Sequence, residues 1–313
     1  MSDDPNLTDT CFFVQDGPPS AWWTSPDIGI LDPNQPEIDP QSGLYNFIYD
    51  AIKPNYPYKW MVSVNRSTEC ATVPEGTTLI AELWAANPAL VMTPQNSVKI
   101  GSVESSNIPG AGSSHWIFPD EANYWTPSTD ATAPDGPGHK CLIARGYPQG
   151  QTPDPADFHC PDDPHVAQRN IEILPATFGE PFRFKINTVA SPDSPDQRAT
   201  IRVAMITAPA RRLMHRLRSS LARFGHRRLA STPPRRLVLD FPKDMKAKPG
   251  AEPPEKTAAY EALVHLEPRR PHDFYLMADV SHAQRGETFV FDVIQHNSRG
   301  KVEGGLTVIA VVA

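Results

Sequence analysis

Proline constrains the fold of this chain more than any other residue type. The chain holds 35 prolines among 313 residues, spread along the sequence without a repeating period. This is about twice the usual frequency. A proline inside a helix removes a backbone donor and clashes with the preceding turn. The sequence therefore argues against a protein built of long helices and favours short strands joined by long loops.

The clearest strand pattern lies between residues 58 and 87. Apolar residues recur at every second position from Trp60 to Val64 and again from Leu79 to Ala85. Alternation with a period of two is typical of a half-buried strand. Turn-forming residues separate the two runs. We therefore expect this stretch to supply a strand pair of a β-sandwich.

Similar patterns recur through the rest of the chain and predict a mainly β fold with two sandwich-like units. We expect the first unit at about residues 1–175, closed by a strand over 166–174, and the second at about 176–313. The further strands expected by alternation or apolar runs are 98–103, 114–118, 140–146, 182–186, 199–209, 235–242, 273–280, 286–297 and 306–312.

Charge is divided unevenly along the sequence. Residues 1–196 contain 9 Lys or Arg against 25 Asp or Glu, whereas residues 197–239 contain 11 Arg and no acidic residue. An acidic body with one concentrated basic segment can associate head to tail with its own copies, or offer that segment to another anionic partner.

Within the basic stretch, residues 211–228 predict an amphipathic helix inserted in the second unit. Leu213, Leu217, Leu221 and Phe224 recur at spacings of four, four and three, which forms one apolar stripe. Gly225 is a suitable stop signal. The arginines that cover the other faces, and that we expect to contact a partner, are Arg211, Arg212, Arg216, Arg218, Arg223, Arg227 and Arg228.

Four interpretations of this segment stay open. The stripe packs on its own sandwich with the arginines solvated, or the helix docks on an acidic patch of another subunit. A basic amphipathic helix also suits a membrane surface, and basic charge supports non-specific phosphate contact. No aromatic residues are interleaved to stack on bases, and the body of the chain is acidic, so we do not expect nucleic acid as a partner.

The four cysteines, Cys11, Cys70, Cys141 and Cys160, allow two disulfides in three connectivities. A Cys141–Cys160 disulfide would clamp the loop between them, and free thiols are the alternative. Histidines near these two cysteines are possible zinc ligands, but their spacing matches no standard knuckle. We therefore expect no metal site.

Tryptophans raise the possibility of carbohydrate binding. Trp22 and Trp23 are adjacent, so in a strand they point to opposite faces and one of them can lie at the surface. With Trp116 and Trp125 they form the candidate set for stacking on a sugar ring. The other interpretation is that neighbouring loops cover the rings.

Motifs of enzyme active sites are missing from the sequence. It contains no G-x-S-x-G, no phosphate-binding loop, no H-E-x-x-H and no dinucleotide fingerprint. We therefore expect a protein that is not an enzyme and uses no cofactor.

Targeting signals are equally scarce. The first residues, MSDDPNLTDT, are acidic and polar, and no apolar stretch approaches the ~20 residues of a spanning helix. We expect a soluble chain without a membrane span or a cleaved signal, and a route to the cell surface without such a signal stays open.

The order of these features resembles the immunoglobulin-like sandwich domains of bacterial surface and secreted proteins, in particular the adhesion-related (CARDB-like) family. The resemblance covers about residues 22–174 and departs at Arg66-Ser67, where a glycine is usual. It implies an immunoglobulin-like sandwich with an adhesive or architectural role and transfers no functional residues. The matching positions are Asn65, Pro109, Gly110, Trp116, Gly138, His139, Ala144 and Asn170.

Together these features favour a non-catalytic structural or adhesive protein. We expect it to bind other proteins, or copies of itself, in a surface, fibre or sheath-like assembly. The alternative is a carbohydrate-binding module that uses exposed tryptophans.

Overall fold

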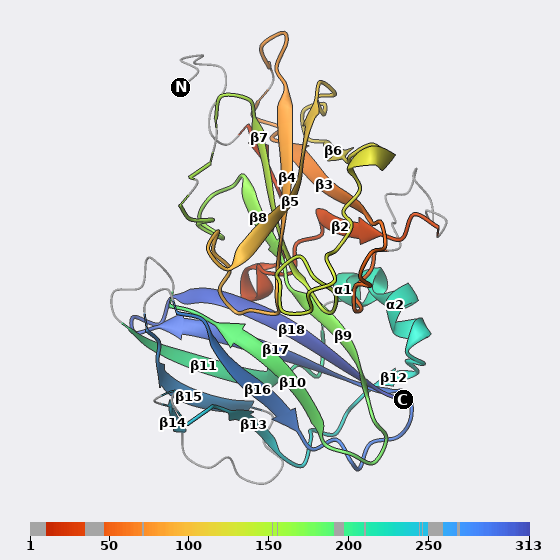
Figure 1. Cartoon of the computed structure of the whole chain (residues 1–313), viewed down its shortest axis with the longest axis vertical. Coiled ribbons are helices and arrows are strands. Elements are labelled where there is room, and N and C mark those ends of the chain that lie inside the picture. Colours follow the sequence, from red (N-terminus) through yellow and green to blue (C-terminus); the bar gives the residue numbers. More distant parts are fainter. Residues whose placement is uncertain are drawn as a thin grey trace. The chain divides into compact units, whose positions relative to one another are not determined.

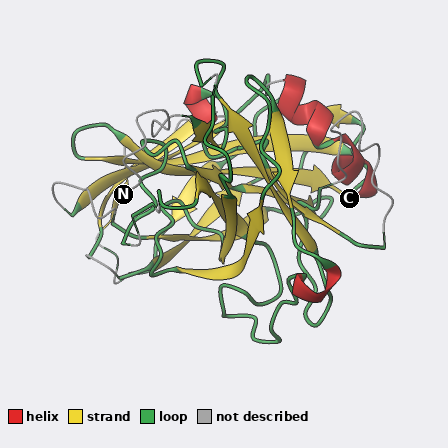
Figure 2. Ribbon diagram, turned by 90° about the horizontal axis from the view of Figure 1, so that it is seen from above, coloured by secondary structure: helices red, strands yellow, loops and turns green. Residues whose placement is uncertain are grey.

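The chain is mainly β, as the sequence predicts, and the strands of its described residues form four sheets (Figures 1 and 2). In this computed structural model the contacts divide the chain into two compact units, Met1–Asn87 with Met92–Arg169, and Pro88–Val91 with Asn170–Ala313. The residues that the structure describes are 11–34, 47–70, 72–151, 153–154, 156–190, 197–209, 211–243, 245, 247–249, 259–267 and 270–313.

Unit 1 contains two antiparallel four-stranded sheets. The first has the order β1-β3-β2, with β6 also paired to β3, and the second has the order β5-β4-β7-β8. The strands are β1 (Phe12–Phe13), β2 (Ile28–Leu31), β3 (Lys59–Arg66), β4 (Leu79–Ala86), β5 (Ser97–Ser105), β6 (Ser114–Ile117), β7 (Cys141–Pro148) and β8 (Val166–Arg169).

The core of unit 1 confirms the alternation in residues 58–87. Trp60 and Val64 of β3 and Leu79 and Leu83 of β4 are fully buried in one cluster, although their strands belong to different sheets. The two sheets therefore enclose a common core, as in a β-sandwich. A short 3₁₀ turn, η1 (Pro19–Ala21), and a second, η2 (Glu121–Asn123), lie in the connections.

Unit 2 contains a three-stranded sheet of order β10-β16-β13 and a seven-stranded sheet of order β14-β15-β11-β17-β18-β9, with β12 also paired to β17. The pairs β18–β9 and β12–β17 are parallel, and the others are antiparallel. The strands are β9 (Ile171–Ala176), β10 (Phe182–Thr188), β11 (Arg198–Met205), β12 (Arg228–Leu229), β13 (Leu237–Asp240), β14 (Ala247–Pro249), β15 (Ala259–His265), β16 (His272–Ala278), β17 (Glu287–Asn297) and β18 (Val302–Val312).

The helix predicted over 211–228 is shorter and broken. It forms α1 (Arg211–Arg216) and α2 (Arg218–Arg223), separated by Leu217. Gly225 ends α2 as predicted, in the left-handed conformation with a φ of 77°. The amide of His226 donates to the carbonyl of Leu221, and the amide of Gly225 donates to the carbonyl of Ala222. These two bonds form a Schellman cap, after which the chain turns into β12.

The single strand predicted over 166–174 is wrong, because it is two strands that belong to different units. β8 pairs with β7 in unit 1, whereas β9 pairs in parallel with β18 in unit 2. The residue between them, Asn170, is completely buried. Its side-chain amide donates to the carbonyls of Ala89 and Gly305, each at 2.6 Å. These bonds attach β9 and the segment Pro88–Val91 to β18.

We predict that Asn170→Ala destabilises unit 2 by about 2–4 kcal/mol, because it leaves two buried carbonyls without the amide that satisfies them. Chemical denaturation followed by circular dichroism measures the loss. Asn187→Ala, at a partly exposed amide on β10, is the matched control and should cost less than about 1 kcal/mol. An equal loss in both variants would contradict the role of Asn170.

Candidate functional site

The basic segment, defined here as residues 211–228, is anchored by its leucines. Leu217 and Leu221 are buried, whereas Leu213 and Phe224 are half-buried. The apolar stripe therefore packs into the protein and directs the other faces of α1 and α2 outward.

The end of the basic segment is tied to β17 by backbone bonds. The amides of Arg227 and Arg228 donate to the carbonyl of Gly286 at 2.8 and 3.3 Å, and the amide of Ala230 donates to the carbonyl of Thr288 at 2.9 Å. Gly286 has a φ of 83°, and a Cβ added there would lie 2.7 Å from Cγ of Arg227. The segment is thus held at both its helical and its extended part.

The arginines of the basic segment lie mostly at the surface. Arg218, Arg223, Arg227 and Arg228 are exposed, and Arg216 is half-buried. The side chains of Arg211 and Arg212 lie outside the described residues, although their backbones belong to α1.

Arg223 and Arg228 have contacts with side chains of unit 2. Arg228 pairs with Glu287 at 2.8 Å, and Arg223 donates to the hydroxyl of Ser220 at 3.1 Å. No described residue forms an ion pair with Arg218 or Arg227. Arg228 is held through Nε and Nη2 by Glu287, at 3.0 and 2.8 Å, and by Gln284. Arg218 and Arg227 are exposed and are therefore the arginines best placed to meet an acidic partner.

The tryptophans predicted to stack on a sugar are largely covered. Trp22, Trp23 and Trp125 are 5%, 1% and 4% exposed. Trp22 and Trp23 contact each other edge to face at 5.9 Å, and Trp125 packs against Tyr58 at 6.1 Å. A sugar needs an open ring face, so the prediction is wrong for these three. Trp116 is half-buried against Phe47 and stays a candidate.

The predicted Cys141–Cys160 disulfide is also wrong. The disulfide joins Cys11 to Cys70, which are 59 residues apart in sequence, and Cys141 and Cys160 are thiols. Pairing of β1 with the end of β3 places Phe12 opposite Arg66 and so brings Cys11 close to Cys70. Burial, followed by the nearby carboxylates, raises the pKa of Cys160 well above its usual value.

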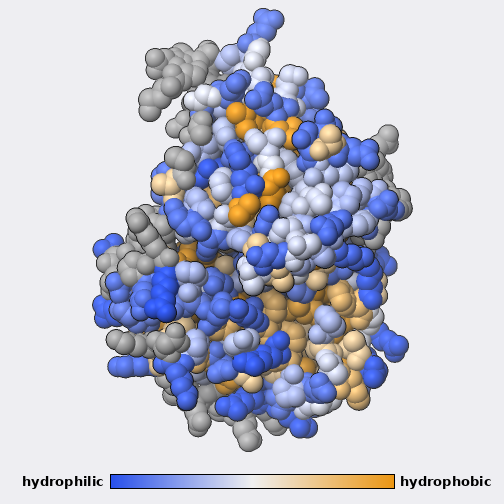
Figure 3. Space-filling model, viewed as in Figure 1, coloured by the Kyte–Doolittle hydropathy of each residue, from blue (hydrophilic) through white to orange (hydrophobic). Residues whose placement is uncertain are grey.

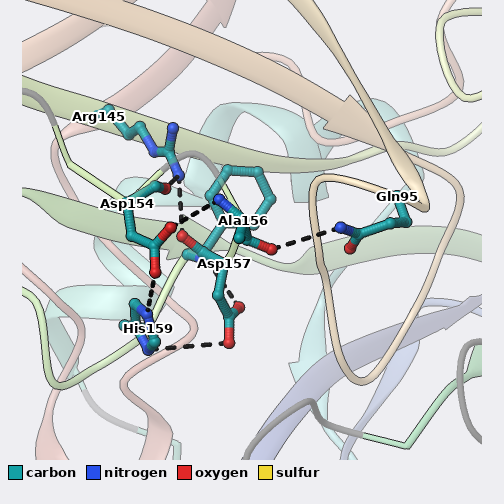
Figure 4. A network of polar contacts seen from close by, with 7 residues as sticks. Gln95, Arg145, Asp154, Ala156, Asp157 and His159 are labelled. Carbon is teal, nitrogen blue, oxygen red and sulfur yellow. Dashed lines mark hydrogen bonds and ion pairs between the residues drawn. The ribbon is translucent and has the colours of Figure 1, made fainter.

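A buried arginine that the sequence gave no reason to single out holds the loop after β7. Arg145 is 4% exposed and donates through Nη2 to the carbonyls of Asp154 and Asp157, the latter at 2.9 Å (Figure 4). Its guanidinium carbon lies 4.8 Å from the ring centre of Phe158 and 5.6 Å from that of Trp84. One cation thus fixes both the backbone and an aromatic side chain of the loop.

The same loop carries a histidine between two carboxylates. Nε2 of His159 lies 3.0 Å from Oδ2 of Asp154, and its Nδ1 lies 3.8 Å from Oδ2 of Asp157 (Figure 4). The hydrogen bond from His159 lowers the pKa of Asp154. Both ring nitrogens of His159 therefore face carboxylates, and the raised pKa of the adjacent Cys160 keeps its thiol protonated. The arrangement therefore lacks an activated nucleophile.

The described residues contain no group of three His, Cys, Asp or Glu side chains arranged to hold a metal ion. Of the histidines that the sequence places near the cysteines, His165 contacts Asp163 at 3.1 Å and His159 contacts the two aspartates named above. Within the same residues, none of the helices is long and apolar enough to cross a membrane.

The carboxylate of Asp16 lies close enough to Cys160 to help raise the pKa of that thiol. Burial and the neighbouring Asp27 raise the pKa of Asp16 to about 7. Asp27 is itself buried and accepts hydrogen bonds from the amide of Gln15 and the side chain of Asn65. With one of its oxygens buried and unbonded, Asp16 is better accommodated in its neutral form.

We predict that Arg145→Met loosens the loop at residues 156–159 while β4 and β7 stay folded. The change keeps much of the stem but removes the donors to two carbonyls, at a cost on the order of 2–4 kcal/mol. Hydrogen exchange of the loop amides measures it. Arg145→Lys keeps the charge but lacks the planar fork of the guanidinium group. Its loop amides should exchange at rates between those of the wild type and the Met variant. Unchanged exchange in the Met variant would contradict the role of Arg145.

We predict that Asp16 makes unit 1 less stable as the pH rises. The folded-state pKa of about 7 lies above the ordinary aspartate value of 3.8, so the folded state binds the proton more tightly. The contribution of Asp16 to the free energy of unfolding is fully present below about pH 4. It is lost as the pH rises towards 7, and its size is on the order of 2–4 kcal/mol.

The Asp16→Asn variant should remove this contribution and flatten the pH dependence of the free energy of unfolding between about pH 4 and 7. Replacement of the exposed Asp120 by Asn is the control and should leave the slope unchanged. Equal slopes for the wild type and the Asp16 variant would count against the assignment.

Comparison with known proteins gives little. No family model matches the chain, and no curated protein matches it. Among solved structures, a collagen adhesin from S. aureus is 8% identical with a TM-score of 0.24, over 84% of this chain and 93% of that chain. The C-terminal domain of the antigen I/II-family protein AspA from Streptococcus pyogenes is 8% identical with a TM-score of 0.23, over 93% and 100% of the two chains.

Similarities this low carry no argument about fold, partner or activity. These two structures come from bacterial proteins. The narrower resemblance to the CARDB-like family stays a prediction.

Proposed function

We propose that this chain is a non-catalytic structural or adhesive protein that binds acidic protein surfaces, including those of its own copies, through the basic segment. The observation that carries the proposal is the way these arginines are presented. Buried Leu217 and Leu221 and the pairing of β12 with β17 fix the segment to unit 2, while Arg218 and Arg227 stay exposed. Little conformational freedom is lost when such a surface binds.

Charge makes the chain itself a suitable partner. Residues 1–196 carry a large excess of acidic over basic side chains, and residues 197–239 carry 11 arginines. Arginine is suited to carboxylates because its planar fork donates two parallel hydrogen bonds. Complementary patches also raise association rates and fix the register of the complex.

The arrangement of ionisable groups supports a non-catalytic role. Around the loop that Arg145 holds, the histidine, carboxylates and thiol are used to fix the backbone or are kept protonated. Buried Trp22, Trp23 and Trp125 disfavour the carbohydrate-binding alternative.

The disulfide bears on location. Disulfides persist in oxidising compartments and are rare in the cytosol. The Cys11–Cys70 bond in unit 1 therefore supports a working place outside the cytoplasm, at or beyond the cell surface.

The test is charge reversal, Arg218→Glu with Arg227→Glu, measured by biolayer interferometry on immobilised wild-type chain. We expect binding at low salt to weaken at least about tenfold, because two attractive contacts become repulsive. The control, Arg183→Glu with Arg299→Glu, makes the same change in net charge at exposed arginines outside the segment. Equal binding by the test variant and the wild type would overturn the proposal.

A further inference from the structure

We propose that the free edge of β5 pairs with β5 of a second copy in a two-fold symmetric, antiparallel arrangement. The sheet β5-β4-β7-β8 would then continue across the interface as an eight-stranded sheet. This proposal is independent of the basic segment and adds a second, differently built contact between copies.

The first observation is that β5 is a long and open edge. With nine residues it is the longest edge strand of the four described sheets, and β4 is its sole partner among the described residues. Unpaired amides and carbonyls along an edge are a template for another strand.

Other edges are shorter or partly covered by backbone. At β8, the amide of Ser25 donates to the carbonyl of Gln168 at 2.9 Å. At β10, Asn187 exchanges backbone bonds with Pro88 and Leu90 at 2.8 and 3.0 Å. Figure 3 shows apolar side chains among polar ones over β4 and β5, and Val98 is 36% exposed.

The second observation is a bulge that sets the faces of β5. Leu83 lies opposite Gly101 and the next residue, Trp84, lies opposite Lys99, so Ile100 is an extra residue. Gly101 faces the core, where a Cβ would lie 2.4 Å from the ring of Trp60. The side chains of β4 that alternate with its core residues face outward, and Lys99, Ser102 and Glu104 lie opposite them on β5. These three residues therefore share the outer face of the sheet.

The third observation is that this outer face is complementary to itself. Ile100 is the extra residue of the bulge and takes no strand position of its own. Lys99 therefore lies two positions before Ser102, and Glu104 lies two positions after it. A two-fold axis through Ser102 then places Lys99 of each copy opposite Glu104 of the other, and Ser102 opposite its own counterpart. Cross-strand pairs of opposite charge stabilise an antiparallel pairing, and like charges destabilise it.

The inner face agrees with the same register. Val103 would lie beside Gly101 of the second copy, and Val98 beside Ser105, which covers an apolar side chain that is now exposed. Lys99 already contacts Glu82 at 3.1 Å, but its side chain is 45% exposed and can reach a second carboxylate. Glu104 is exposed.

Bulges and lysines also serve to keep edge strands from pairing. If the bulge and Lys99 act in this way, β5 stays unpaired in solution. Two experiments distinguish this interpretation from the proposed dimer.

The first experiment is cysteine cross-linking of the full chain. Ser102→Cys should form an intermolecular disulfide under mild oxidation, because the axis brings the two positions face to face. Ser106→Cys is the control, since it is an exposed serine just beyond β5 and the register places its two copies far apart. Preferential cross-linking at position 102 supports the proposal, and equal or absent cross-linking at 102 overturns it.

The second experiment is charge exchange followed by sedimentation at low salt, in chains that also carry Arg218→Glu and Arg227→Glu so that the contact through the basic segment is removed. Chains with these two changes and no others serve as the wild-type reference. Glu104→Lys should raise the dissociation constant of the dimer at least about tenfold, because it opposes two like-charged pairs. A mixture of Glu104→Lys chains with Lys99→Glu chains should restore dimers, since each lysine then faces a glutamate. A Glu104→Lys variant that dimerises like the wild type overturns the proposal, as does a wild-type chain that stays monomeric.

Discussion

In unit 1, the burial of the inward faces of β3 and β4 between two sheets is the constraint on which the rest of the unit depends. It places Trp60 and Leu83 in one core although their strands lie in different sheets. Prolines and loops can then fill the connections without interrupting the strands. With the cores formed in this way, the outward faces and the edges of the sheets are left to carry charge and contacts.

Two such surfaces, the basic segment and the edge of β5, would act differently in an assembly. A basic segment that binds an acidic patch elsewhere on a copy is a heterologous contact, which continues from chain to chain. A two-fold pairing at β5 is isologous and closes after two copies. A protein with both contacts builds an extended, linked array, which suits a fibre, a sheath or a surface layer. With either one alone, it forms an open chain or a dimer.

The sequence predicted features that depend on neighbouring residues and missed those that depend on distant ones. Alternation identified β3 and β4, and the leucine stripe with Gly225 located the helical segment and its end. The disulfide was missed because Cys11 meets Cys70 through the register of β1 on β3. Arg145 was missed because nothing local shows that two carbonyls of a later loop converge on it. Asn170 likewise divides one apparent strand into two through carbonyls distant in sequence.

The most direct test of assembly through these two contacts is the molar mass of the wild-type chain, measured by light scattering with increasing protein concentration, at low salt and at about 0.5 M salt. With both contacts present, we expect species larger than a dimer at low salt that shrink to a dimer when the charges are screened. A monomer of 34.5 kDa at every concentration and in both buffers would contradict it.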